Sequence, residues 1–383
     1  MRRADATERL RAVQTTRAPG ELVASLEDPS PEVVRAAITR LVDLEGPRAA
    51  GALRERLLDV DLSLVADVAG ALRRIGDGGA VEVAVDALAD GRYSRRLAAV
   101  RALGALGDPR AAPRVRTMLD DDVAGVRSAT LDALARLGPR AGADAGSDCA
   151  RLLADPVAHV RIAAVRAVAR LVTHPGEMLA PAAEDEDRFV RLEVAGHVAG
   201  LPERAAKTLL ADSEVRVREA AARAAGAREV GALAVLLTDD PVPDVRRASA
   251  RTLGAMRDRR VADVLIPGLE DPDPLVRAAV LRALEELLTR ATAVRRLCDE
   301  LGSDRAKRRR ATVYALAHLK AREAAIELAR CAEDPDPDVR LALVHSADAL
   351  FEKPESLMRY LASDSDQAVR QGAEMWLLRA TRS

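Results

Sequence analysis

A short phrase, Asp-Pro-x-Pro-x-Val-Arg, returns about every 31 residues along the 383-residue chain. Its clearest copies are residues 271–277 and 334–340, and each is followed by a run rich in alanine and leucine. A fixed period of this length is typical of stacked structural repeats, in which each unit contacts mainly its neighbours. The period therefore predicts an array of repeats instead of one globular core.

The last residue of the phrase, which we call the marker position, is arginine in almost every copy. We place it at Arg35, Arg96, Arg127, Arg161, Arg191, Arg218, Arg246, Arg277, Arg309, Arg340 and Arg370, with Val65 as the one lapse and Arg310 as an equal choice for Arg309. No long insertion interrupts the series. We therefore expect a single solenoid over 1–383, with an N-terminal cap at 1–19, repeats over 20–363 and a C-terminal capping helix at 364–383.

One repeat predicts two helices. The segment Asp271-Pro272-Asp273-Pro274 has turn chemistry, and proline is favoured in the first turn of the helix that follows. Apolar residues then recur with helical spacing, at Val276, Ala279, Val280, Ala283 and Leu284. The preceding stretch, 260–270, predicts a shorter helix that Pro267 bends or loosens. The expected fold is all-α: a right-handed α-solenoid, or superhelix, of about twelve stacked helical hairpins with one concave wall.

The recurring aspartate and arginine predict a structural ladder. The marker arginine lies beside the apolar arc, where a guanidinium needs an acceptor, and the aspartate of a turn is the obvious partner. Breaking one partly buried pair should cost about 2–4 kcal/mol because an unpaired charge remains. The predicted ladder residues are Arg35, Arg96, Arg127, Arg161, Arg191, Arg218, Arg246, Arg277, Arg340 and Arg370.

A second row of residues lies five positions after the marker, opposite the apolar arc. Stacked repeats would align this row along the second helices, which we expect to form the concave wall. We predict that its arginines bind a partner with an acidic surface; the alternative is a solvated helix face in an arginine-rich protein. The candidate partner-binding residues are Arg40, Arg101, Arg166, Arg223, Arg251 and Arg282.

Composition disfavours several classes of protein. The net charge is −1 and only 2% of residues are aromatic, so neither a basic field nor stacking platforms for bases favour nucleic acid. Cys149, Cys298 and Cys331 are widely spaced and predict no disulfide framework. The chain has neither an apolar signal segment at its start nor 18 consecutive apolar residues. We expect a cytoplasmic protein that does not bind a membrane.

The phrase Asp-Pro-x-Pro-x-Val-Arg-x-Ala-Ala, with Leu-Gly closing the helix at 103–104 and 253–254, resembles the HEAT-repeat superfamily. It is most similar to the short repeats of the phycobilisome-lyase type, and the resemblance runs from about Gly20 to Leu378. It implies the solenoid fold and no particular activity.

Enzymes that share this architecture provide tests of chemistry. Deoxyhypusine hydroxylases hold two iron ions through His-Glu dipeptides, whereas no histidine here precedes glutamate. HEAT-like DNA glycosylases use aromatic and basic side chains on the concave wall, and this chain has a single tryptophan, Trp376. A bilin lyase activity would rest on the repeat type alone. We find no catalytic constellation and expect no metal site and no cofactor.

Two local features stand out. The cluster Arg305-Ala306-Lys307-Arg308-Arg309-Arg310 replaces the usual acidic turn; it is compatible with phosphate binding, although we favour a solvated turn. Trp376 belongs to a bulky last helix and is expected to plug the final repeat instead of contacting a ligand.

We therefore interpret the chain as a non-catalytic scaffold or adaptor that binds a protein or peptide on a concave helical surface. The alternative is a lyase-type or other enzyme subunit that binds a small molecule in the groove, and nucleic-acid binding is a third, disfavoured reading. The sequence identifies neither the partner nor the oligomeric state.

Overall fold

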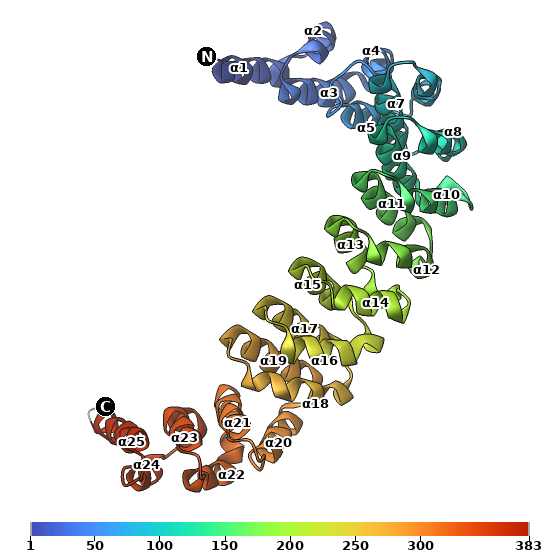
Figure 1. The fold of residues 1–383 in the computed structure, drawn as a ribbon. Coiled ribbons are helices and arrows are strands. Elements are labelled where there is room, and N and C mark those ends of the chain that lie inside the picture. The colour runs from blue at the N-terminus through green and yellow to red at the C-terminus, as the bar shows by residue number, and fades with distance from the viewer. Residues whose placement is uncertain (1, 382–383) are drawn as a thin grey trace. The chain divides into compact units, whose positions relative to one another are not determined.

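The computed structural model describes residues 2–381 and contains no β-strand within that range. The chain divides into two compact units. Unit 1 comprises residues 1–194 and 200–205, and unit 2 comprises 195–199 and 206–383. Both units are built from α-helices and short 3-10 turns, so the prediction of an all-α repeat solenoid is confirmed (Figure 1).

Unit 1 begins with α1 (Arg2–Thr15), which packs on α3. Helical hairpins follow, each with a short first helix and a longer second helix. They are α2 (Pro19–Ala24) with α3 (Pro31–Glu45), α4 (Ala50–Arg56) with α5 (Val65–Arg74), α6 (Gly79–Asp86) with α7 (Tyr93–Leu106), α8 (Ala112–Thr117) with α9 (Ala124–Leu137), α10 (Ala145–Arg151) with α11 (Ala158–Leu171), and α12 (Gly176–Leu179) with α13 (Arg188–Ala195).

Unit 2 has the same alternation of short and longer helices. It includes residues 195–199 and resumes within α14, at residue 206. Its hairpins are α14 (Glu203–Leu210) with α15 (Val215–Ala224), α16 (Val230–Asp239) with α17 (Pro243–Ala255), α18 (Ala262–Leu265) with α19 (Pro274–Leu287), α20 (Arg290–Glu300) with α21 (Ala306–His318), α22 (Ala325–Ala329) with α23 (Pro337–Leu350), and α24 (Glu355–Leu361) with α25 (Gln367–Ala380). The hairpins from α2 to α25 thus number twelve, as the period predicted.

Local sequence explains where the helices begin and end. Helix α19 begins at Pro274, and the side chain of Asp273 accepts hydrogen bonds from the backbone N–H groups of Leu275 and Val276. An N-cap of this kind satisfies donors that have no partner within the helix. The first helix of the same hairpin is shorter than expected, since α18 gives way to the 3-10 turn η12 (Ile266–Glu270) around Pro267.

The core of each unit consists of small aliphatic side chains packed between successive second helices, and in unit 2 this packing is interrupted between α19 and α21. In α19, the predicted apolar arc is buried, including Val276, Val280 and Leu284. The second helices α7, α9 and α11 pack consecutively in unit 1, as do α15, α17 and α19 in unit 2. Because each helix covers the apolar face of the one before it, no single hairpin buries its own core.

Glycine permits the closest approach between successive second helices. A Cβ atom added at Gly254 would lie 2.6 Å from the Cβ and 2.8 Å from the Cα of Ala283 on the next second helix. The equivalent glycine in unit 1, Gly104, would place its Cβ 2.9 Å from the Cβ of Ala133. These contacts explain why glycine follows leucine at the end of the repeat: a larger residue would collide with the next second helix.

Replacing Gly254 with alanine is expected to destabilise unit 2 by about 1–3 kcal/mol, because the added methyl group pushes α19 away from α17. Gly231 is the matched control: it lies in α16, is exposed, and an added Cβ would meet no atom within 4 Å. Gly231→Ala should instead stabilise by about 0.5–1 kcal/mol through helix propensity. Urea unfolding of both variants measures the difference, and shifts of the same sign would contradict the packing argument.

The last hairpin holds the single tryptophan. Trp376 on α25 is 8% exposed, and its indole Nε1–H donates to Oδ1 of Asp348 on α23 at 2.7 Å. At the other end of the chain, α1 buries Val13 and leaves Leu10 half-buried. Among the described residues, no helix is long and apolar enough to cross a bilayer.

Candidate functional site

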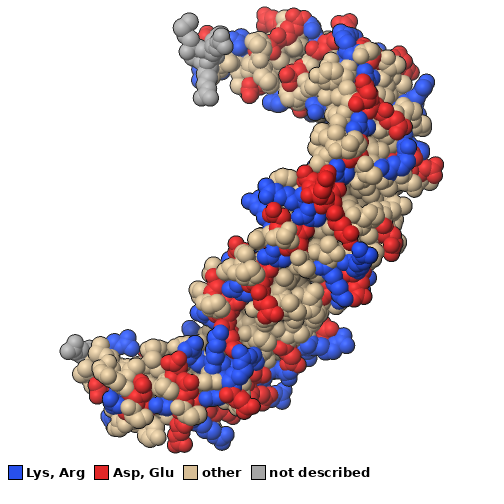
Figure 2. Space-filling view, in the orientation of Figure 1, with Lys and Arg blue, Asp and Glu red and all other residues tan. Residues whose placement is uncertain are grey.

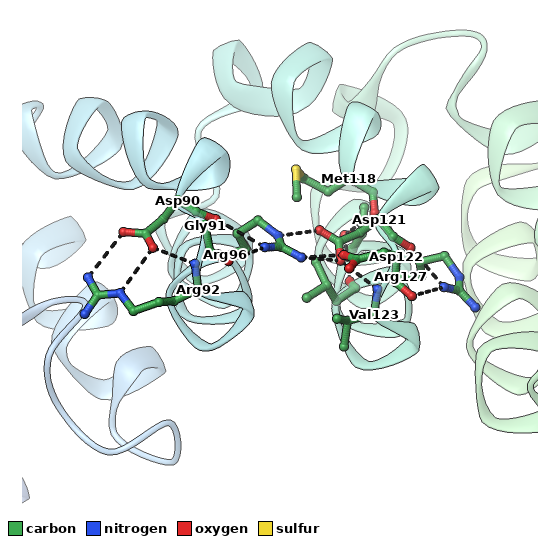
Figure 3. A network of polar contacts seen from close by, with 11 residues as sticks. Asp90, Gly91, Arg92, Arg96, Met118, Asp121, Asp122, Val123 and Arg127 are labelled. Atoms are coloured by element: carbon green, nitrogen blue, oxygen red, sulfur yellow. Dashed lines mark hydrogen bonds and ion pairs between the residues drawn. The ribbon is translucent and has the colours of Figure 1, made fainter.

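The marker arginines link consecutive turns, and Figure 3 shows the link in unit 1 that Arg96 makes to Asp121, with Arg127 on the far side of that turn. Arg96 Nε and Nη2 donate to Asp121 Oδ2 and Oδ1 at 2.7 and 3.0 Å, and Nη1 donates to the carbonyl oxygen of Asp90 at 3.2 Å. Arg127 repeats the arrangement with Asp155 at 2.7 and 2.9 Å and with the carbonyl oxygen of Asp121 at 2.9 Å. Each guanidinium therefore joins the turn before its own helix to the turn before the next one.

The same two-sided arrangement recurs in both units. The paired residues are Arg96–Asp121, Arg127–Asp155, Arg161–Asp185, Arg218–Asp240, Arg246–Asp271, Arg309–Asp334 and Arg340–Asp364. Arg309 occupies the ladder position, whereas its neighbour Arg310 pairs with Asp338. The partner carboxylate also accepts a backbone N–H two residues further on, as Asp155 does from Val157. One aspartate thus shapes a turn and anchors an arginine.

Three further predicted ladder residues bind the turn before their own helix. Arg191 donates to the carbonyl oxygens of Asp185 and Glu186. Arg370, in the last repeat, donates to the carbonyl oxygens of Asp364 and Ser365. Arg277 donates to the carbonyl oxygens of Asp271 and Pro272 at 2.8 and 3.0 Å.

Arg35 is out of register with the other markers, and its assignment is corrected. It lies seven residues after the turn aspartate Asp28, whereas Arg96 lies six residues after Asp90. The position equivalent to Arg96 is Val34 in this repeat. In the next repeat it is Asp67, instead of Val65 as expected from the sequence. Arg35 Nε contacts Asp67 Oδ2 at 3.0 Å, and both side chains are more than 40% exposed. This pair lies on the surface and stabilises little.

Burial sets the strength of the ladder pairs. Arg246 and Asp271 are 8% and 4% exposed, and Arg161 and Asp185 are 8% and 9% exposed. The hydrogen bonds from Arg340 lower the pKa of Asp364, outweighing the opposite effect of burial. For Asp155, burial alone would raise the pKa, but hydrogen bonds from Arg127 and from a backbone N–H leave it below its usual value.

The lowered carboxylate pKa values predict acid sensitivity. A carboxylate whose pKa is depressed in the folded state stabilises the fold above its unfolded pKa of about 4, and this stability is lost as the pH falls through the folded pKa. Urea unfolding at pH 7, 5 and 3 should therefore show little change between the first two values and a clear loss at pH 3. Asp364→Asn should reduce that loss, and equal stability at pH 5 and pH 3 would contradict the prediction.

The structure separates the six candidate binding arginines into different environments. Arg40 is half-buried and donates to the carbonyl oxygen of Thr16, and it shares the register shift of Arg35. Arg101 donates to the carbonyl oxygen of Leu62 at 3.3 Å. Arg166 pairs with Glu193 at 2.7 Å, and Arg223 pairs with Glu219 on its own helix.

Arg251 and Arg282 differ from the other candidates. Both are exposed, and the structure gives neither a hydrogen bond nor an ion pair with any described residue. They line one groove of about 360 Å³ between α17 and α19, together with Arg247, Leu275, Ala278, Ala279, Ala283 and Glu286. Arg247 is held by Asp244 at 2.6 Å, and Leu275 is 58% exposed. This groove therefore combines two available cations with an apolar floor.

The corresponding row in unit 1 is mixed in charge. A groove of about 500 Å³ there is lined by Arg101, Asp132, Arg136 and His159, among others. Desolvation raises the pKa of Asp132, although the nearby Arg136, Arg166 and Arg101 oppose the shift. Figure 2 shows Lys and Arg interspersed with Asp and Glu over the visible face. Within unit 1, the arginines of this row therefore do not form an uninterrupted positive stripe.

Groups able to carry out chemistry are sparse among residues 2–381. Burial raises the pKa of the Cys149 thiol to about 12 and that of Cys331 to about 11, which keeps both thiols protonated. The Tyr314 hydroxyl lies 3.4 Å from Nδ1 of His345. No group of three or more His, Cys, Asp or Glu residues in this range is placed to hold a metal ion.

Two-helix layers, stacked through an aliphatic core and tied by Asp–Arg pairs, define a helical repeat scaffold. The chain belongs to the HEAT-repeat family, which matches residues 63–135, 229–317 and 294–377. The resemblance inferred from the Asp-Pro-x-Pro-x-Val-Arg phrase is thereby confirmed.

Several solved structures are similar to this chain. YibA of Escherichia coli is 18% identical over 73% of this chain and 94% of its own, with a TM-score of 0.49. An engineered protein is 19% identical over 93% of this chain and 97% of its own, with a TM-score of 0.36. Kap121p, in a structure bound to Nup53p, is 13% identical over 99% of this chain and 55% of its own, with a TM-score of 0.47. No curated protein sequence matches the chain.

Proposed function

We propose that the protein is a non-catalytic scaffold that binds an acidic segment of a partner protein in the groove between α17 and α19. The observation that carries the proposal is the pair Arg251 and Arg282, which are exposed and have no partner within the described chain. A guanidinium without an internal acceptor is free to form bidentate hydrogen bonds with a carboxylate.

The surroundings of the two arginines favour a peptide over an isolated ion. Leu275 and the alanines between the two arginines offer apolar contact, and such contacts add affinity to charge pairs at an interface. The arginines are 31 residues apart in sequence and occupy equivalent positions on successive second helices. A segment that crosses both helices would therefore place one acidic residue near each guanidinium.

Charge reversal tests the proposal. A fluorescein-labelled peptide of alternating glutamate and alanine serves as the probe, with a lysine–alanine peptide as the charge control. The double variant Arg251→Glu, Arg282→Glu is expected to weaken binding of the acidic peptide by at least tenfold, since each 1.4 kcal/mol of lost interaction is a factor of ten. Fluorescence anisotropy at low and physiological salt provides the measurement.

A matched double variant controls for net charge. Arg259 and Arg330 are exposed arginines of unit 2 that do not line the groove. Arg259→Glu with Arg330→Glu changes the charge of the protein by the same amount and should leave the affinity within about twofold. If both double variants weaken binding equally, or if the wild-type protein does not bind the acidic peptide, the groove is not the binding site.

A further inference from the structure

The ladder is interrupted inside unit 2, at Arg277. This guanidinium donates Nη1 to the carbonyl oxygens of Asp271 and Pro272, as the other ladder arginines do with their own turns. Its opposite edge has no carboxylate partner among the described residues, whereas Arg246 and Arg309, the markers before and after it, each hold an aspartate through two hydrogen bonds. One edge of the Arg277 guanidinium is thus available to a ligand.

The interruption has a cause in the sequence. Ser303 stands where the other turns carry aspartate, six residues before Arg309. It keeps the backbone role of that residue, because its carbonyl oxygen accepts from Arg309 Nη1 at 2.8 Å and its hydroxyl accepts from the N–H of Arg305 at 3.3 Å. A serine hydroxyl cannot supply the carboxylate that an arginine of the preceding repeat would bind.

Positive charge accumulates at the same place. Arg305 and Arg308 both bind Glu270, whose side chain is 6% exposed, and Arg310 binds Asp338. Lys307 is exposed and has no hydrogen bond or ion pair with any described residue. Glu270 is therefore occupied by these arginines, and Asp271 by Arg246. Lys307 and the free edge of Arg277 have no ion-pair partner among the described residues.

Helix packing leaves room between these cations. Close packing of consecutive second helices is extensive between α17 and α19 and between α21 and α23, but it is nearly lost between α19 and α21. Helix α21 packs instead on α20 and on the 3-10 turn η12. A cavity of about 490 Å³ lies there, lined by Leu269, Glu270, Asp271, Arg277, Lys307, Arg310, Ala311 and Tyr314.

We propose that this cavity binds a phosphate group, which takes the place of the missing turn carboxylate. The guanidinium edge of Arg277 matches two oxygens of a phosphate, and Lys307 supplies a compact positive charge. The Tyr314 hydroxyl can donate to the third oxygen, and the N-terminal turn of the 13-residue helix α21, which carries Lys307, favours an anion. The sequence favoured a solvated turn for this cluster. The proposal assigns only its Lys307 to the phosphate, because Arg305, Arg308, Arg309 and Arg310 are each engaged with a carboxylate.

The ligand is either free phosphate or a phosphorylated group on a larger molecule. Isothermal titration calorimetry with inorganic phosphate and with O-phosphoserine, at matched ionic strength, tests both sources. We expect binding of at least one of them to the wild-type protein, with a higher melting temperature in phosphate than in chloride. Stronger binding of phosphoserine assigns the site to a phosphorylated partner, and equal binding assigns it to the free ion. Binding of neither overturns the proposal.

Three variants locate the site. Lys307→Gln and Arg277→Gln should each weaken phosphate binding at least tenfold. Lys307→Gln removes an exposed side chain with no internal partner, so it keeps the test valid if Arg277→Gln fails to fold. Arg259→Gln removes the same charge from an exposed position outside the cavity and should leave binding unchanged. If Lys307→Gln binds phosphate as tightly as the wild type, the proposal is overturned. None of these variants alters Arg251 or Arg282, so the result is independent of the peptide groove.

Discussion

Replacing Asp271 with asparagine is expected to lower the free energy of unfolding of unit 2 by about 3–5 kcal/mol. Asp271 is 4% exposed and accepts from Arg246 Nε and Nη2 at 2.6 and 2.9 Å. Asparagine keeps the size of the side chain and can still accept the N–H of Asp273, so the turn survives while the charge is lost. The Arg246 guanidinium, 8% exposed, is then left buried without a counter-charge.

The control is Asp258→Asn in the same unit. Asp258 also accepts a backbone N–H two residues ahead, from Arg260, and pairs with that arginine at 2.8 Å. The Asp258 and Arg260 side chains are 37% and 91% exposed to solvent. Asp258→Asn should therefore lower the free energy of unfolding by at most about 1 kcal/mol. Urea unfolding monitored by circular dichroism compares the two variants. Equal losses would show that the ladder stabilises the stack no more than an ordinary surface pair.

Replacing Trp376 with alanine is expected to destabilise the C-terminal hairpin by about 3–5 kcal/mol. The indole fills space between α25 and α23, and its removal also leaves Asp348 without the hydrogen bond from Nε1. Leu378 on the same helix is 55% exposed, and Leu378→Ala should change stability by at most about 0.5 kcal/mol. Thermal unfolding by circular dichroism provides the measurement.

The wild-type protein offers an independent test of the same contact, because Trp376 is the single tryptophan of the chain. A buried indole should emit at shorter wavelength than a solvated one, and its emission should shift to the red as α25 detaches. If the native protein already shows the emission of a solvated indole, Trp376 is not the plug of the last repeat.

Much of the fold could be predicted because the repeat contains its own structural signals. The spacing of Val276, Val280 and Leu284 defines a buried helix face, and Asp273 with Pro274 marks where that helix begins. The assignment of residues 1–19 and 364–383 as caps of one solenoid stays a prediction. The register failed at Arg35 because the first copy of the phrase has one additional residue before its arginine.

The candidate site was less predictable because it depends on how side chains are partnered. The sequence places Arg166, Arg223, Arg251 and Arg282 in equivalent positions, yet Glu193 and Glu219 neutralise the first two. Spacing along the chain does not reveal which carboxylate a long guanidinium side chain reaches. The gap at Arg277, by contrast, was visible in the sequence as serine in place of aspartate at position 303.

The two-sided arginines also bear on how such a chain can evolve. Asp240 and Asp271 perform the same task, since each accepts from the arginine before it and offers its carbonyl oxygen to the arginine after it. Deleting residues 241–271 would leave Arg218 bound to Asp240 and would bring that same carbonyl oxygen to Arg277. Duplication or loss of a whole segment thus joins a turn to a helix whose arginine can bind it. Recombination can therefore change the length of the protein in steps of one hairpin.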